Sequence, residues 1–268
     1  MREITFFYPS KSFPTLSVTG GECALDCTHC RKLFLQNMIP TSTPESLSET
    51  CLSLWQKNVE GVLVSGGCDS EGRVPLFFDI LGEIRKTTGL ILNVHSGFVD
   101  EKNLSGLKIA NPHYVSFDIP TTHALRNVYG INRRSEDYIH SLRLLKESGL
   151  VAVPHVCLGM NNDSVEEREI LKRISRISDK VVLTVVFSAR GTDFESTRLN
   201  SEEIIDIFRF ARPLFKTINL GCMRPRMRKI EEEALILNGI VQPTQWARRK
   251  AQGLDLQIRE KKTCCVVD

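Results

Sequence analysis

The sequence lacks the features of a membrane protein and of a polynucleotide-binding protein. No apolar run approaches the roughly 18 residues needed to span a bilayer, and the N-terminus has no long apolar core of a signal peptide. The 35 Lys and Arg against 32 Asp and Glu leave a formal charge of +3, too small and dispersed for a nucleic-acid surface. We therefore expect a cytoplasmic protein without membrane or nucleic-acid partners.

Low-complexity segments, internal repeats and long linkers are also absent from the sequence. Hydrophobic residues make up 41% of the chain and charged residues 25%, so the chain has enough apolar side chains for a sizeable core. Its 268 residues suit one large domain, because about 250 residues is usual for a single α/β barrel. We place this domain at residues 1–256 and expect residues 257–268 to form a charged, cysteine-containing tail beyond it.

Apolar, β-branched runs alternate with amphipathic stretches, which is typical of repeated βα units. The predicted strands span residues 15–19, 61–65, 90–95, 114–118, 151–157, 181–187 and 217–222, with a short eighth at 239–241. Helical patterns occupy residues 44–57, 76–86, 135–147, 164–177, 201–214 and 229–237. Parallel strands with right-handed crossovers close into a barrel at seven or eight units, which predicts an α/β fold of the (βα) TIM type, partial to complete.

Cysteine is abundant for an intracellular chain. In a reducing cytoplasm, metal or thiol chemistry explains such cysteines better than disulfides do. The nine are Cys23, Cys27, Cys30, Cys51, Cys68, Cys157, Cys222, Cys264 and Cys265. We expect oxygen sensitivity, and we assign Cys51 to the core because it falls within a predicted helix.

Three of these cysteines, Cys23, Cys27 and Cys30, follow the first predicted strand with Cys-x3-Cys-x2-Cys spacing. Soft thiolates suit zinc or iron-sulfur clusters, and three of them leave a cubane cluster with one iron free for another ligand. Structural zinc sites use paired Cys-x2-Cys halves and four closed ligands, and no second close pair follows here. The spacing therefore favours a 4Fe-4S cluster, with a zinc-binding module as the alternative.

This loop resembles that of the radical S-adenosylmethionine (radical SAM) superfamily, whose members share Cys-x3-Cys-x-aromatic-Cys at the top of a partial or full barrel. His29 stands in the aromatic place. The resemblance implies a 4Fe-4S cluster on Cys23, Cys27 and Cys30, with the fourth iron chelated by the methionine group of S-adenosylmethionine. Electron transfer then cleaves that molecule to a 5'-deoxyadenosyl radical, while the protein supplies position and exclusion of water.

Two further segments are similar to the family's cofactor-binding motifs. Gly66 and Gly67 resemble its Gly-Gly-Glu motif, which contacts the methionine amino group, although Cys68 stands where the acidic residue is often found. Asp118 ends a predicted strand and, by resemblance to biotin synthase, would accept hydrogen bonds from the ribose hydroxyls. The alternatives are a simple strand-to-loop turn at the glycines and a turn start at Asp118.

Further residues resemble the family's positions beside the adenine and the methionine carboxylate of S-adenosylmethionine. Gly159 lies in a segment similar to the family's glycine-bearing segment beside adenine. Arg133 or Arg134 would lie near the methionine carboxylate, although an arginine at a helix start is equally suited to solvent.

Biotin synthase is similar in a second respect, because barrel-strand cysteines and an arginine hold its additional, sulfur-donating cluster. Three cysteines here lie at or near the ends of predicted strands, and buried packing is their alternative role. The implied auxiliary cluster comprises Cys68, Cys157 and Cys222, completed by Arg224, Cys264 or Cys265. The terminal pair has two other possible roles, as a disulfide or as an idle exposed end. His95 and His155 also end predicted strands, but neither receives a catalytic role.

A wider set of segments resembles a biotin-synthase-related, archaeal-type family. The segments are SVTG at residues 17–20, QNM at 36–38, SGGC at 65–68, DIP at 118–120 and GCMRPR at 221–226. One group in that family is a component of a two-protein lipoyl synthase, which implies sulfur insertion into an octanoyl chain on a lipoyl carrier protein. The implied partners are that carrier, a sister radical SAM protein and an electron donor such as ferredoxin.

Two other functions remain open at this point. A radical SAM reaction without sulfur insertion, such as a rearrangement or cofactor maturation, needs only the first three cysteines. A non-catalytic zinc module would use the same cysteines plus one more thiol, with the basic segment 224–229 binding nucleic acid.

Overall fold

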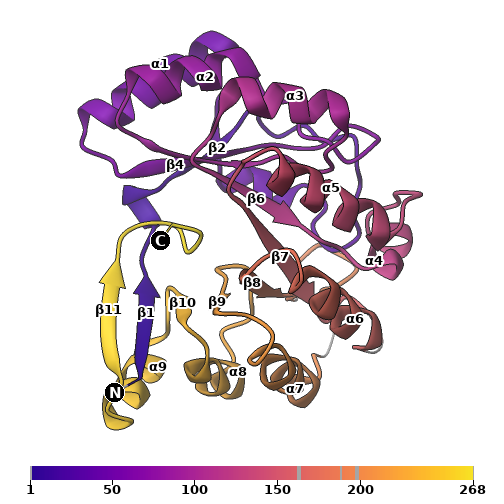
Figure 1. Cartoon of the computed structure of the whole chain (residues 1–268), viewed down its shortest axis with the longest axis vertical. Helices are drawn as coiled ribbons and strands as arrows, with labels where there is room; N and C mark the ends of the chain where they lie inside the picture. Colours follow the sequence, from indigo (N-terminus) through magenta and orange to yellow (C-terminus); the bar gives the residue numbers. More distant parts are fainter. Residues whose placement is uncertain (1, 162–163, 188, 197–198, 268) are drawn as a thin grey trace.

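The computed structural model describes residues 2–161, 164–187, 189–196 and 199–267. Their strands form one 11-stranded sheet in the order β11-β1-β10-β9-β8-β7-β6-β5-β4-β2-β3, with every neighbouring pair parallel. The sheet curls, and helices cover its outer face (Figure 1). The predicted partial (βα) barrel is therefore confirmed.

The strands are β1 (Glu3–Phe7), β2 (Thr15–Ser17), β3 (Ile39–Pro40), β4 (Gly61–Ser65), β5 (Ile91–His95), β6 (Tyr114–Asp118), β7 (Ala152–Leu158), β8 (Lys180–Val185), β9 (Thr217–Leu220), β10 (Gly239–Val241) and β11 (Gln257–Lys261). The helices are α1 (Pro44–Gln56), α2 (Phe78–Thr87), α3 (Glu101–Ala110), α4 (Thr122–Asn127), α5 (Ser135–Glu147), α6 (Val165–Ile174), α7 (Ser201–Ala211), α8 (Arg228–Glu233) and α9 (Gln245–Gly253). Short 3-10 turns are η1 (Ser10–Ser12), η2 (Leu33–Asn37) and η3 (Ala234–Ile236).

Local sequence signals fix the helix starts that place the loops. The Thr43 side chain accepts a hydrogen bond from the Ser46 amide at the start of α1, next to Pro44 in the first turn. Asp100 and Asn200 cap α3 and α7 in the same way. Each cap satisfies an amide that the helix leaves unpaired, so the helices begin at defined residues and the strand-to-helix loops keep defined lengths.

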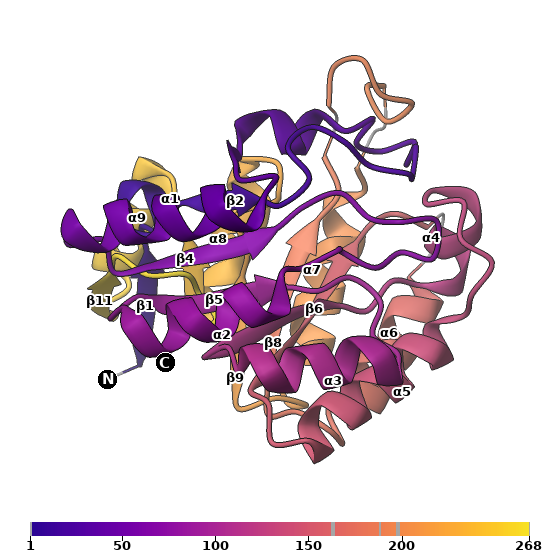
Figure 2. The same cartoon turned by 90° about the horizontal axis from the view of Figure 1, so that it is seen from above.

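The apolar faces of sheet and helices meet in one large core on the outer side of the curled sheet. Val64, Leu92, Val115 and Val156 are fully buried strand residues of this core. Alternate residues of the same strands point inward, since successive side chains of a strand point to opposite faces. The inner face is therefore free to carry polar groups such as Asn93 and His95. Helices α2 and α3 lie side by side on the outer side of the sheet (Figure 2).

All eight predicted strands correspond to observed ones, β2 and β4 to β10. The sequence analysis missed β1, β3 and β11. Strand β11 pairs in parallel with β1, from Glu3 opposite Gln257 to Phe7 opposite Lys261. It lies at one end of the sheet and β3 at the other, so the sheet does not close through backbone hydrogen bonds in the described part of the chain.

The chain beyond β11 turns back into the barrel, which differs from the charged tail that the sequence predicts. Cys265, Val266 and Val267 are 4%, 0% and 8% exposed. They pack with inward-facing residues from separate parts of the sheet, including Phe7 of β1, Val153 of β7 and Val182 of β8. We call residues 264–267 the C-terminal plug. Burial of this short apolar run explains why the end of the chain does not extend into solvent.

Within the described ranges, the helices are all too short or too polar to cross a membrane.

Candidate functional site

An interior cavity of about 260 Å³ lies on the concave side of the sheet. Its lining brings together residues that are far apart in the sequence, including His29, Asp118, Cys157, Cys222 and Cys264. Parallel strands end on the same side of a barrel, so residues at those ends converge there. His29 belongs to the loop with the Cys-x3-Cys-x2-Cys spacing, so this loop lies at the cavity beside the strand ends.

The cysteine loop is held by backbone hydrogen bonds to two neighbouring segments. The Ala24 amide donates to the Cys68 carbonyl at 2.8 Å, and the Thr28 amide donates to the Val128 carbonyl at 2.9 Å. The Cys68 amide in turn donates to the Cys23 sulfur at 3.2 Å. These contacts fix the loop between the segment after β4 and the end of α4, which fixes the positions of its thiols.

The thiols of Cys27 and Cys30 are hydrogen-bonded to each other. That bond lowers the pKa of Cys30 to about 7, and with burial it raises the pKa of Cys27. No three His, Cys, Asp or Glu side chains among the described residues are spaced for a single metal ion. An iron-sulfur cluster binds its thiolates on separate iron atoms, so its ligands need not converge on one point. Three thiolates are ligands of the type that an iron-sulfur cluster takes, so the donor chemistry of Cys23, Cys27 and Cys30 is compatible with one.

The two glycines after β4 let the cysteine loop lie directly against the backbone. A Cβ atom on Gly67 would lie 2.0 Å from the Glu22 carbonyl oxygen and 2.6 Å from the Cys23 Cβ. The Gly67 amide donates to the Thr19 hydroxyl at 2.7 Å. A Cβ atom on Gly66 would be less crowded, at 3.1 Å from the Thr19 hydroxyl oxygen. Only glycine at position 67 allows this close approach, which links the Gly-Gly pair to the placement of Cys23.

Asp118 and His95 form an ion pair that faces the cavity. The Asp118 Oδ2 lies 3.2 Å from the His95 Nε2. Burial alone lowers the pKa of His95, but the Asp118 carboxylate outweighs it, so the pKa of His95 is raised. Burial raises and His95 lowers the pKa of Asp118, with a net lowering. Asp118 therefore presents an ionised carboxylate to the cavity, and it favours the protonated form of His95.

His155 lies beside this pair in the neutral form. Burial lowers its pKa to about 4. Its Nδ1 is 3.0 Å from the Val153 carbonyl oxygen, which can only accept, so Nδ1 carries the proton. The rings of His95 and His155 are 6.3 Å apart. His95 ends β5, but His155 lies within β7 rather than at its end, where the sequence analysis placed it. A histidine in a predicted strand was the signal in the sequence, although it did not distinguish a site residue from a core residue.

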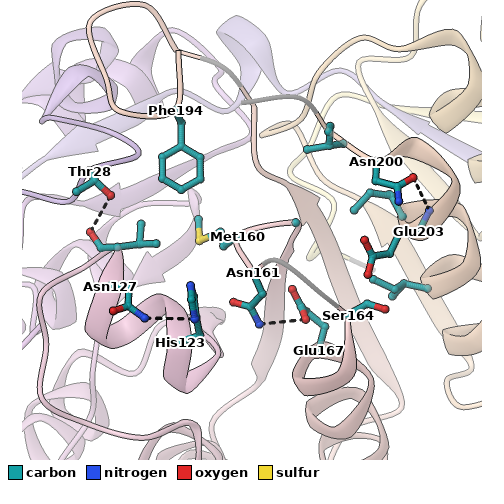
Figure 3. Close-up of a pocket in the computed structure, with 15 residues that line it drawn as sticks. Thr28, His123, Asn127, Met160, Asn161, Ser164, Glu167, Phe194, Asn200 and Glu203 are labelled. Carbon is teal, nitrogen blue, oxygen red and sulfur yellow. Dashed lines mark hydrogen bonds between the residues drawn. The ribbon is translucent and has the colours of Figure 1, made fainter. Parts of the chain in front are cut away.

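A second cavity, of about 430 Å³, opens beside the first (Figure 3). Its lining includes Thr28 of the cysteine loop, Gly159, Asn161, Phe194 and Glu203. Gly159 has a φ of +82°, a conformation that glycine adopts without steric cost. The mixture of amide, carboxylate and aromatic groups around an open cavity suits a polar, planar ligand such as a nucleoside.

Met160 separates the two cavities and lines both of them. The Tyr129 hydroxyl donates to the Met160 sulfur at 3.4 Å. The His29 ring packs 5.2 Å from the Tyr129 ring, and the His29 Nδ1 is buried without a hydrogen-bond partner in the described structure. An unpaired buried nitrogen is costly, so a ligand that reaches it would relieve that cost. The sequence analysis gave Tyr129 no role.

Arg133 lies outside the linings of both cavities. Its guanidinium carbon is 3.8 Å from the centre of the Phe98 ring, and it pairs with Glu71. Its Nε is buried without a partner among the residues described. Its neighbour Arg134 precedes α5, where its backbone amide donates to Asp137. The structure thus commits the guanidinium of Arg133 to Glu71 and to the face of Phe98.

The residues of the predicted auxiliary cluster do not all meet. Cys157, Cys222, Cys264 and Cys265 line the interior cavity. Cys68 instead contacts Cys23, through the Cys68 amide and the Cys23 sulfur.

Arg224 is also outside that cavity lining, because its guanidinium forms an ion pair with Glu231 at 2.8 Å and both side chains are fully buried. It also donates to the Gly221 carbonyl at 2.5 Å. The arginine that the resemblance assigned to a cluster therefore joins the segment after β9 to α8.

The cavity face of the plug carries an acidic thiol. A hydrogen bond from Cys265 and from the amides of Val266 and Cys265 lowers the pKa of Cys264 to about 7 despite burial. Cys157, by contrast, is hydrogen-bonded to Thr184 on the neighbouring strand, and burial raises its pKa to about 12. At neutral pH the two thiols of this cavity therefore differ in how readily they form a thiolate.

Comparison with known proteins gives a sequence relative and a set of similar structures. No protein-family model matches the chain. Biotin synthase of Bacillus subtilis is 21% identical over 209 residues, which cover 74% of this chain and 62% of that protein, less than two thirds of its length.

The solved structures extend the similarity to nearly the whole chain. Methylornithine synthase superposes with a TM-score of 0.63 at 16% identity, over 96% of this chain and 84% of that one. SuiB of Streptococcus suis, solved with S-adenosylmethionine bound, has a TM-score of 0.53 at 11% identity, over 99% of this chain and 52% of its own. The chain is therefore similar in sequence to biotin synthase, as predicted, and shares the fold of methylornithine synthase and of SuiB, whereas its resemblance to a lipoyl synthase component stays a prediction.

Proposed function

We propose that this protein is a radical SAM enzyme that carries a 4Fe-4S cluster on Cys23, Cys27 and Cys30. The observation that carries the proposal is the seating of the cysteine loop at the strand ends, between two cavities. The loop's own amides, of Ala24 and Thr28, donate to carbonyls of the adjoining segments, and the glycine at position 67 admits the loop at a distance that no other residue allows. Similarity to biotin synthase supports the same assignment.

The residues around the loop fit S-adenosylmethionine. The ionised Asp118 would accept hydrogen bonds from the ribose hydroxyls, because a carboxylate is a strong acceptor. The cavity of Gly159 and Asn161 would hold the adenine, and the unpaired Nδ1 of His29 lies at the boundary. Arg133, which the resemblance assigned to the methionine carboxylate, pairs instead with Glu71 and lies outside both cavity linings. When bound, the cluster and the cofactor would supply a 5'-deoxyadenosyl radical that removes a hydrogen atom from the substrate.

The protein's own contribution is position and exclusion of water. The cavity lining includes the apolar side chains of Phe34, Val182 and Val186, and the plug closes the barrel below it. Holding a reactive centre within contact distance of its target accounts for about 7 to 11 kcal/mol of a barrier in well-oriented reactions. A dry, shaped cavity of this kind also prevents quenching by solvent.

The finer part of the proposal is the substrate, an octanoyl chain presented by a lipoyl carrier protein, into which sulfur is inserted. Its support is the resemblance of the sequence segments together with four cysteines in one cavity. The interior cavity, of about 260 Å³ and lined by apolar side chains such as Phe34, Val182 and Val186, suits a small apolar group such as part of a fatty acyl chain. A sister radical SAM protein would form the other carbon–sulfur bond, and a ferredoxin-like protein would supply electrons.

Anaerobic reconstitution followed by reduction in the presence of S-adenosylmethionine tests the general proposal. We expect release of 5'-deoxyadenosine from the wild type and none from a Cys23→Ala, Cys27→Ala, Cys30→Ala variant. A Cys51→Ala variant, which alters a buried core thiol outside both cavity linings, is the matched control and should retain activity. Cleavage that persists in the triple variant would refute the assignment.

The substrate is tested separately with an octanoylated carrier protein. We expect the octanoyl group to gain the mass of one sulfur atom from the action of this protein. A second sulfur atom should be gained only when the sister protein is added. Cofactor cleavage without any sulfur gain on this carrier would instead favour a radical reaction without sulfur insertion.

A further inference from the structure

Residues 189–196, between β8 and α7, form a loop that lies against the cysteine loop, and we call them the strap. The Asp193 amide donates to the Thr28 carbonyl at 3.1 Å. The ring of Phe194 lies edge-on to the ring of His29, with 6.3 Å between their centres. Phe194 and Thr28 also lie next to each other at the second cavity, which both of them line (Figure 3). The strap therefore joins the cysteine loop to one wall of that cavity.

Arg31, directly after Cys30, links the strap to the cysteine loop through its guanidinium. Its Nη2 donates to both carboxylate oxygens of Asp193, at 2.9 and 3.1 Å. Its Nη1 pairs with the carboxylate of Asp26, which belongs to the cysteine loop itself. A single exposed ion pair contributes little, but a guanidinium that holds two carboxylates from separate segments forms a network of defined geometry. Arg31 thus ties the cysteine loop to the strap.

The backbone after Cys30 adopts a conformation that depends on such contacts. Arg31 and Lys32 have φ angles of +44° and +63°, in the left-handed region that residues other than glycine rarely adopt. Residues of this kind persist where the surrounding structure holds them. The amides of Cys30 and Arg31 both donate to the Cys27 carbonyl, at 3.0 and 2.9 Å. The turn at Arg31 therefore helps to set where Cys30 lies relative to Cys27.

The network lies at the surface and not in the core. The side chains of Arg31, Asp26 and Asp193 are 34%, 68% and 56% exposed. Removal of a buried ion pair leaves an uncompensated charge in the core, whereas exposed side chains return to water. The contribution of this network is therefore to the local geometry of the loop, and the barrel does not need it to fold.

We propose that Arg31 is a positioning residue: through Asp193 it holds the cysteine loop in the form that receives the iron-sulfur cluster. The same contact holds the wall of the second cavity against that loop, so one ion pair aligns the cluster site with the cavity for the adenine. This inference rests on the proposed function, because it concerns the cluster and the cofactor that the loop and the cavity would hold.

Exchanging the two charges tests the pair. Arg31→Asp places a carboxylate opposite Asp193, and aspartate tolerates a left-handed backbone. Loss of a residue that orients metal ligands costs about 10- to 100-fold in metal affinity, so the reconstituted variant should lose iron to a chelator at least about 10-fold faster than the wild type. The double variant Arg31→Asp, Asp193→Arg restores an ion pair of opposite polarity and should recover the wild-type rate.

Lys32→Asp is the matched control, because it makes the same change of charge at the next residue, which shares the left-handed backbone. It should lose iron at the wild-type rate. Amide hydrogen exchange of residues 23–30 in the cluster-free protein is a second readout that needs no iron. Exchange should be faster in Arg31→Asp and should match the wild type in the control and in the double variant.

The outcomes separate this inference from the proposed function. Equal iron loss and equal exchange in Arg31→Asp and Lys32→Asp would overturn the inference, as would a double variant that does not recover. Unfolding curves of the variants should superpose, and a destabilised Arg31→Asp protein would make the role one of folding and not of positioning. Faster exchange that the double variant reverses, in a protein that takes up no iron, would leave the ion pair standing and refute the proposed function.

Discussion

Gly67→Ala tests whether the glycine pair serves the cysteine loop. The new Cβ would lie 2.0 Å from the Glu22 carbonyl oxygen and 2.7 Å from the Cys23 Cα, both of them backbone atoms. Ordinary contact begins at 3.4 Å, so the loop must retreat by about 1.4 Å. Overpacking of this kind costs about 1–3 kcal/mol, and a displacement of about 1 Å at a reacting centre costs on the order of 100-fold in rate.

The assay is 5'-deoxyadenosine release and iron content after anaerobic reconstitution. We expect Gly67→Ala to lower the rate of 5'-deoxyadenosine release about 100-fold or more. Iron should be lost from the cluster on Cys23, Cys27 and Cys30 if Cys23 is displaced too far. Gly21→Ala is the control in the same loop, because its Cβ would meet nothing within 4 Å. Equal rates for Gly67→Ala and the wild type, or equal losses for the two glycine variants, would refute the reasoning.

Two further variants test the electrostatics of the interior. Asp118→Asn removes the carboxylate that raises the pKa of His95, so burial should bring that pKa below its usual value, which NMR titration of the cluster-free protein would detect. In the wild type, the raised pKa of His95 stabilises the folded state below the unfolded pKa of histidine, and this contribution is lost as the pH rises through the raised folded pKa. The Asp118→Asn variant should lack this pH dependence of the free energy of unfolding. An unchanged dependence of stability on pH would contradict the His95–Asp118 ion pair. Arg224→Met leaves the buried Glu231 with only Thr244 and the more distant Arg226 as partners, and should lower the free energy of unfolding by up to about 3–5 kcal/mol in chemical denaturation while sparing the iron. Unchanged stability together with a loss of iron would instead support Arg224 as a ligand of the predicted auxiliary cluster.

The buried strands were predictable because their residues are apolar along continuous runs. Val62 and Val64 of β4, and Val181 and Leu183 of β8, lie under helices, so the sequence shows the strand directly. Strand β11 has the opposite character: Gln257, Arg259 and Glu260 are exposed at the sheet edge, and their pairing with β1 joins the two ends of the chain. A charged edge strand with a remote partner leaves no periodic signal.

The site was predictable where one loop supplies its residues and less so where tertiary contacts do. The spacing of Cys23, Cys27 and Cys30 identified the cysteine loop, since the ligands lie within eight consecutive residues. The plug was predicted as a tail because its short apolar run belongs to no helix or strand. Lys180 and Asn219, which donate to carbonyls of the plug, were the available signal, as polar residues within otherwise apolar strands imply an internal partner.

The most direct test of the central claim is the release of 5'-deoxyadenosine by the reconstituted, reduced wild type, measured beside the variant that lacks Cys23, Cys27 and Cys30. The account predicts release by the wild type that requires S-adenosylmethionine and is absent from the variant. A wild-type protein that binds zinc, or that carries iron but leaves S-adenosylmethionine intact, would contradict it.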